Sequence, residues 1–136
     1  MKLKLKDSKS QLEFRLEIIK GKRYDAIQWI GFNMSPKFFI KCYLFTYFSH
    51  LFFGTKRYLD DARKLYNLRT KEQWILSSMI PRVNKLDIEK WAIVIADDPI
   101  TNNTYNTVVK YCDSHTPFKV RIFQDINKAI VWLEED

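Results

Sequence analysis

The sequence predicts one α/β domain over residues 1–136, with a mostly parallel five-stranded sheet, one antiparallel edge strand and four helices. Three observations support this class. An unbroken apolar run at residues 91–96 is typical of a strand that is buried on both faces. Ser-Pro at 35–36 and Asp-Pro at 98–99 mark helix starts after strand-like segments. Strand and helix patterns follow one another in the order β-β-α-β-α-β-α-β-α.

Residues 12–20 and 24–32 predict an antiparallel hairpin that opens the sheet. Apolar and charged residues alternate over most of the first segment, which is typical of a half-exposed strand at a sheet edge. Gly21-Lys22-Arg23 is a tight connection, and a connection of this length joins antiparallel strands. Residues 1–11 before it form a basic N-terminal segment that could be flexible.

The helix predicted at residues 36–53 is apolar almost all round, which is the least ordinary feature of the chain. Gly54 ends it as a left-handed C-cap would. The sheet hides one face of such a helix, and the other is covered by the fold itself, by a second copy of the chain, or by a lipid-like ligand or membrane surface. If this face is exposed, its expected anchors are Phe45, Phe48 and Phe52.

The second half of the chain supplies the remaining βα units. Residues 56–62 predict a strand that ends at Asp60 and Asp61, followed by a polar loop. Thr70 and Gln73 have the spacing of a capping box, and their helix is disturbed by Pro81. The buried strand at 91–96, a helix from 99, a strand at 118–123 and an amphipathic helix at 125–135 complete the order.

Charge and composition exclude several classes of function. The net charge is +7, with 16 Lys/Arg against 6 Asp/Glu in residues 1–71 and 7 against 10 in residues 72–136. The basic residues are scattered among apolar ones and accompany no DNA- or RNA-binding motif, which argues against nucleic acid as a partner. Only Gly21, Gly31 and Gly54 occur, none in a phosphate-binding loop, so a nucleotide cofactor is not expected.

The same features indicate a cytoplasmic protein. Cys42 and Cys112 give no disulfide framework and are expected to be buried free thiols. The longest apolar segment, residues 38–53, contains Lys41 and His50 and falls short of the ~20 apolar residues of a transmembrane span. No apolar run directly follows the basic N-terminus, so no signal peptide is expected.

The sequence gives little support to catalysis or to a metal site. Asp60 and Asp61, and later Asp97 and Asp98, follow predicted parallel strands, where open α/β sheets bind ligands and where carboxylates could hold Mg²⁺. Carboxylates at such positions are also common caps and turn residues, and the lysine that receiver domains place after the last strand is absent, because Phe123-Gln124 stands there. We therefore expect no metal, no cofactor and no catalytic residue.

The element order resembles that of the STAS domains, the SpoIIAA-like group, and looks most like a small stand-alone bacterial branch. The resemblance spans roughly residues 12–136; its strongest motif runs from Phe123 and Asp125 through Ala129 to Trp132-Leu133. It implies a binding module without catalysis, switched by phosphorylation of a serine at a helix start. The family's Asp-Ser-Ser-Gly switch loop is absent, because the segment at 62–74 reads ARKLYNLRTKEQW. Thr70 near the equivalent helix start is the candidate switch residue, or else a plain N-cap.

Three hypotheses of function follow. The first is a non-enzymatic regulatory domain that contacts another protein, or itself as a homodimer, through the helix at 36–53. The second is a carrier or sensor of a small apolar ligand, held in a cavity between this helix and the sheet that the same phenylalanines, Phe45, Phe48 and Phe52, would line. The third is an enzyme that uses the strand-end carboxylates, which predicts a cleft with an aspartate of raised pKa. An exposed apolar patch favours the first hypothesis, and an internal void favours the second.

Overall fold

The computed structural model describes residues 2–8, 10–19 and 21–136, without the side chains of 12–16, 18, 19, 22 and 23. The expected alternation of faces along the first hairpin strand therefore lies outside the described side chains. The description covers the backbone pairing of that strand.

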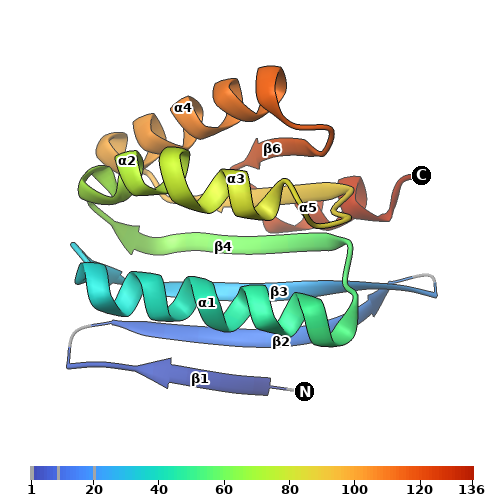
Figure 1. Ribbon diagram of the computed structural model, residues 1–136, viewed down its shortest axis with the longest axis horizontal. Helices are drawn as coiled ribbons and strands as arrows, with labels where there is room; N and C mark the ends of the chain where they lie inside the picture. The colour runs from blue at the N-terminus through green and yellow to red at the C-terminus, as the bar shows by residue number, and fades with distance from the viewer. Residues whose placement is uncertain (1, 9, 20) are drawn as a thin grey trace.

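The described chain forms one six-stranded sheet whose strands lie side by side in sequence order (Figure 1). The pairs β1–β2 and β2–β3 are antiparallel, whereas the pairs from β3 to β6 are parallel. The strands are β1 (Lys2–Lys6), β2 (Gln11–Ile19), β3 (Lys22–Phe32), β4 (Arg57–Tyr66), β5 (Lys90–Ile95) and β6 (Lys119–Phe123). The α/β class and the order of the five expected strands are confirmed.

One strand was not expected. The segment KLKLK forms β1, so β1 rather than β2 is the antiparallel edge strand. β1 forms because lysine and leucine alternate along it, which is a strand pattern. This segment was expected only to be a basic N-terminus. Leu5 packs against the main core, whereas the lysines face solvent.

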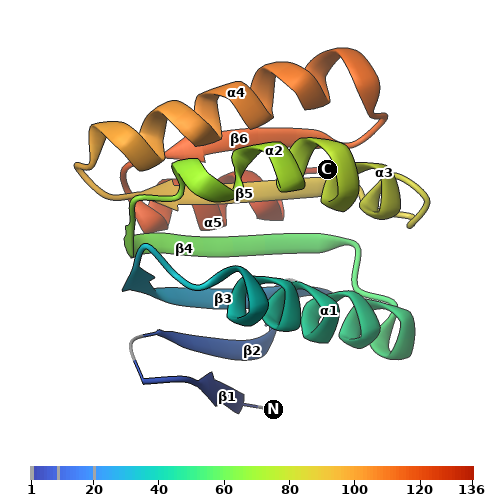
Figure 2. The ribbon, with the colours of Figure 1, turned by 60° about the vertical axis from the view of Figure 1, so that its left-hand side comes forward.

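Helices cover the sheet unequally (Figure 2). α1, the α2–α3 segment and α4 lie on one face, and α5 lies on the other. The bounds are α1 (Pro36–Phe53), η1 (Arg69–Lys71), α2 (Glu72–Trp74), η2 (Ile75–Met79), α3 (Ile80–Val83), α4 (Pro99–His115) and α5 (Ile126–Glu134). Among the described helices, none is long and apolar enough to cross a membrane.

The β5 strand confirms the expectation of burial on both faces. Trp91 and Ile93 belong to the large core cluster beneath α1 and α4, while Ala92 and Val94 belong to the smaller cluster beneath α5. Because successive strand residues point to opposite faces, an apolar residue is needed at every position of this strand.

The helix ends carry the expected caps. The Ser35 hydroxyl accepts from the Phe38 amide at 3.3 Å, and the Asp98 carboxylate accepts from the Thr101 amide at 3.3 Å. Asp125 caps α5 in the same way. Gly54 adopts φ 67° and donates its N–H to the His50 carbonyl at 2.7 Å.

Two local predictions were wrong. β4 continues to Tyr66, so Asp60 and Asp61 lie in mid-strand rather than at its end; the residues expected to form a polar loop pair with the long β3. Thr70 is not an N-cap, because it lies inside the 3₁₀ turn and its hydroxyl donates to Asn33 Oδ1 at 3.4 Å. The expected disturbance at Pro81 is present: a π-helical turn precedes it, since proline has no N–H to donate.

Replacing Gly54 should destabilise the protein. Gly54→Ala places a Cβ on a left-handed residue, so we expect the free energy of unfolding to fall by about 1 kcal/mol. Urea denaturation measures the change. Gly54→Asn is the control, with a smaller loss because asparagine tolerates this conformation. Equal stability of Gly54→Ala and the parent chain would contradict the assigned cap.

Candidate functional site

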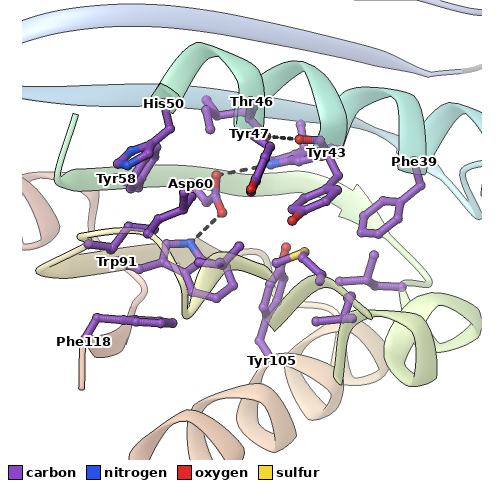
Figure 3. Close-up of a pocket in the computed structure, with 18 residues that line it drawn as sticks. Phe39, Tyr43, Thr46, Tyr47, His50, Tyr58, Asp60, Trp91, Tyr105 and Phe118 are labelled. Carbon is purple, nitrogen blue, oxygen red and sulfur yellow. Dashed lines mark hydrogen bonds between the residues drawn. The ribbon is translucent and has the colours of Figure 1, made fainter. Parts of the chain in front are cut away.

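A pocket of about 90 Å³ lies between α1, the α2–α3 segment and α4, above the sheet (Figure 3). Its walls are overwhelmingly apolar and aromatic. We call it the aromatic pocket; the described residues that line it are Ile27, Trp29, Phe39, Tyr43, Thr46, Tyr47, His50, Tyr58, Asp60, Leu68, Ile75, Met79, Val83, Leu86, Ile88, Trp91, Tyr105 and Phe118.

The floor of the pocket is set by strand register. Asp60 pairs with Ile27 of β3 and Ile93 of β5, so Trp29 and Trp91 are its diagonal neighbours. The register of β3 against β4 shifts between Gln28 and Ile30, which is a local irregularity at Trp29. Irregularities of this kind re-aim side chains beside functional sites.

The α1 wall follows helical spacing. Five residues of α1 line the pocket, and their spacing of mostly three or four residues places them on one side of the helix: Phe39, Tyr43, Thr46, Tyr47 and His50. Figure 3 shows the labelled side chains reaching from α1 toward the sheet.

Asp60 is a buried carboxylate held by two indoles. Trp91 Nε1 donates to Asp60 Oδ2 at 2.6 Å, and Trp29 Nε1 donates to Oδ1 at 3.3 Å (Figure 3). Burial raises the pKa of Asp60 to about 6; the two indole hydrogen bonds lower it and the nearby Asp61 charge raises it. This pocket aspartate with a raised pKa is the feature that the enzyme hypothesis predicted.

A second polar network closes one end of the pocket. His50 Nδ1 shares a hydrogen bond with the Tyr58 hydroxyl, which donates to the Thr55 carbonyl at 3.2 Å. Burial lowers the pKa of His50 and so favours the neutral imidazole. Behind this pair, the Thr55 hydroxyl donates to Asp25 Oδ1 at 3.0 Å, while the buried Oδ2 has no hydrogen-bond partner among the described residues. Burial raises the pKa of Asp25 to about 7.

The predicted contact residues of α1 lie outside this pocket. Phe45 is half-buried against the main core, whereas Phe48 and Phe52 are 60% and 83% exposed. With Leu44 and Leu51 they form a row on the outer side of the helix, which we call the exposed α1 stripe: Leu44, Phe48, Leu51 and Phe52. A binding role for Phe45, Phe48 and Phe52 stays a prediction.

Thr70 also lies away from the aromatic pocket. Its hydroxyl is exposed and accepts from Lys71 Nζ at 2.6 Å, while the same Nζ donates to Asn33 Oδ1 at 3.1 Å. Phosphorylation of Thr70 stays a prediction.

Of the four carboxylates considered as a possible Mg²⁺ site, Asp97 and Asp98 follow β5 as predicted, but the prediction that Asp60 and Asp61 lie at a strand end is wrong. Asp60 lies in the pocket, and Asp61 binds Arg63 with Oδ2 to Nη2 at 2.7 Å. Asp98 caps α4 and accepts from the Asn67 amide at 3.2 Å. Nowhere in the described part of the chain do three acidic, histidine or cysteine side chains gather as metal ligands would. The cause is the length of β4, which separates the first acidic pair from the strand ends.

The ligand-carrier hypothesis places a cavity between the helix at 36–53 and the sheet, but the sequence pattern does not identify the residues that line it. Trp29, Tyr58 and Trp91 lie within predicted strands, and the available signal was an aspartate two positions from Tyr58 within a buried strand. A charged side chain at a core position of a strand needs partners, and tryptophan N–H groups are the partners here.

The buried Asp25 should make stability depend on pH. Its pKa in the folded chain, about 7, exceeds the ordinary 3.8, so between these values the folded chain holds a proton that the unfolded chain has released. Its contribution to stability is therefore lost as the pH rises toward 7. Asp25→Asn should gain about 1–3 kcal/mol relative to the parent chain between pH 4 and pH 8.

Urea denaturation at a series of pH values tests this prediction. Asp60 and His50 titrate in both the parent chain and Asp25→Asn. The difference between their two curves of unfolding free energy against pH therefore reports on Asp25 alone. Asp113→Asn, which changes an exposed carboxylate, is the control. Parallel curves for Asp25→Asn and the parent chain would show that burial does not perturb this carboxyl.

Comparisons with known proteins bear on the fold. No family model matches the chain, and no curated protein matches it. The crystal structure of an uncharacterised protein from Shewanella loihica, of the DUF3478 family and with a SpoIIAA-like fold, is similar to 95% of this chain and 98% of its own, with a TM-score of 0.63 and 15% identity. The chain therefore has a SpoIIAA-like α/β fold, as the STAS resemblance implied.

Proposed function

We propose that this protein is a non-enzymatic, STAS-like regulatory domain that senses or carries a small, mainly apolar molecule in the aromatic pocket. The observation that carries the proposal is the partly open, aromatic-lined pocket between α1, the α2–α3 segment, α4 and the sheet. A ligand carrier needs such a space for its ligand, whereas a domain that only contacts other proteins does not. Pockets of this composition, with few polar groups, are typical of small-molecule sites.

The size of the pocket limits the ligand. An engineered apolar cavity of about 150 Å³ holds benzene. A pocket of about 90 Å³ therefore suits a short branched alkyl group or a small ring, with any larger part of the ligand toward the opening. The polar side chains in the lining, Thr46, His50 and Asp60, would fix its orientation.

Binding without catalysis fits the polar groups better than an enzyme does. Both oxygens of Asp60 accept from indoles, and the Thr46 hydroxyl donates to the Tyr43 carbonyl at 2.8 Å. The described lining contains no serine, cysteine or lysine to serve as a nucleophile.

The thiols of Cys42 and Cys112 are free and buried, which supports the expected cytoplasmic location.

Filling the pocket from α1 should abolish ligand binding. Thr46→Phe places a ring in the space that the ligand would use, so affinity should fall at least about tenfold. Ligand-observed saturation-transfer NMR with neutral apolar fragments measures binding, after native mass spectrometry of the freshly purified protein for any retained small molecule.

Thr107→Phe is the matched control for this experiment. Thr107 lies on α4 outside the pocket lining, and its hydroxyl donates to the Asn103 carbonyl at 3.1 Å, much as Thr46 bonds to its own helix. This variant should bind as the parent chain does. Equal binding by Thr46→Phe would place the ligand elsewhere; no retained mass and no bound fragment would refute the proposed function.

Self-association is a second candidate function, favoured by the exposed α1 stripe. Its apolar side chains lie on one side of α1 at positions i, i+4, i+7 and i+8, and Phe52 is 83% exposed. Contiguous apolar surface of this kind marks contact sites, and a second copy of the chain would bury it isologously.

A charge within the stripe should disrupt such a dimer. Phe52→Asp should raise the dimer dissociation constant at least about tenfold, because an aspartate would lie unpaired in an apolar interface. Light scattering after size exclusion, over a hundredfold range of concentration, measures the mass. The control is Phe32→Asp, since Phe32 is 68% exposed but lies outside the stripe. A parent chain that is monomeric throughout would refute self-association.

A further inference from the structure

The aromatic pocket contains one acidic side chain and no matching cation. Among the described residues that line it, Asp60 is the only carboxylate, and neither lysine nor arginine is present. His50 is neutral near pH 7, because burial lowers its pKa below the ordinary 6.5. A pocket with these walls therefore carries a negative charge at neutral pH.

The geometry of Asp60 leaves it able to bind a further donor. The indoles of Trp29 and Trp91 each use one lone pair, and an ionised carboxylate offers about four acceptor positions. Indole N–H groups are donors without charge, so they orient the carboxylate but do not neutralise it. Figure 3 shows the carboxylate between the α1 side chains and Trp91, on the inner side of the pocket.

The walls around this charge suit a cation as well. Tyrosine, tryptophan and phenylalanine rings attract ammonium groups through the negative electrostatic potential of their faces, and several such rings together recognise alkylated ammonium ligands. The pocket gathers rings from five elements: Trp29 from β3, Tyr43 and Tyr47 from α1, Tyr58 from β4, Trp91 from β5 and Tyr105 from α4.

We propose that the ligand of this pocket is a small organic cation, an alkylammonium whose N–H group donates to Asp60 while its short alkyl part packs among the rings. The inference rests on the ligand-binding function proposed above and names the chemical class. A neutral molecule of the same shape would leave the carboxylate uncompensated, and an anionic molecule such as a fatty acid would be repelled by it.

Ionisation of Asp60 adds a dependence on pH. The titratable groups around Asp60 are His50, Tyr43 and Tyr47 from α1, Tyr58 and Asp61 from β4 and Tyr105 from α4. The pKa of Asp60 is about 6 in the empty pocket, so only about a tenth of the carboxyl is ionised at pH 5 and nearly all at pH 7.5. Affinity for a cation should therefore rise about tenfold over this range.

Three probes of one carbon skeleton test the inference. Isothermal titration calorimetry at pH 7.5 compares 3-methylbutylamine, 3-methylbutan-1-ol and 3-methylbutanoate, which are cationic, neutral and anionic. The amine should bind at least about tenfold more tightly than the alcohol, and the carboxylate more weakly still. Asp60→Asn should weaken the amine at least about tenfold, leave the alcohol within about twofold and remove the pH dependence.

Asp61→Asn is the matched control, because it changes the adjacent carboxylate, which lies outside the pocket lining, and should leave amine affinity within about twofold. The comparison of probes and the pH series use the unmodified chain, so they stand even if Asp60→Asn fails to fold. The cation inference would be overturned, while the proposed function stood, if the alcohol bound the unmodified chain as tightly as the amine does and Thr46→Phe abolished this binding. If no probe binds and Thr46→Phe changes no fragment binding, both are wrong.

Discussion

The hydrogen bonds from Trp29 and Trp91 to Asp60 join three neighbouring parallel strands on one face of the sheet. A carboxylate at this position would oppose folding if it were unpaired, because a buried charge without partners is expensive. Paired with two indoles, it ties β3, β4 and β5 together beneath α1 and α4. The two rings that hold it are also pocket walls, so the interaction that orders the sheet shapes the pocket as well.

This face of the sheet carries polar groups that a purely structural core would not need. Asp25 and Asp60 are both buried there with raised pKa values, and neither has a cationic partner among the described residues. The face beneath α5 also buries charged side chains, but these have partners: Arg57 and Lys90 donate to the Leu133 and Trp132 carbonyls, and Asp61 binds Arg63. Violations of core-packing rules that gather in one place are expected at functional sites.

The limits of sequence reasoning follow from the range of the interactions. β5, the hairpin and the three caps at Ser35, Asp98 and Asp125 were predictable, because each depends on residues close together in the chain. The end of β4 was not predictable, because Arg63 and Lys64 are typical loop residues in sequence and this segment becomes a strand only by pairing with the distant β3. The hydrogen bonds at the pocket floor were not predictable for the same reason, because Trp29 and Trp91, which donate to Asp60, are each 31 residues away in the sequence.

The two sides of the apolar helix α1 have different surroundings. Its inner side packs Phe39 and Tyr43 against the sheet and walls the pocket, whereas its outer side leaves Phe48 and Phe52 in solvent. One helix thus belongs to two candidate binding surfaces. A ligand that changed the position of α1 would change the stripe presented to a second copy. By thermodynamic reciprocity, the second copy would then change ligand affinity by the same factor.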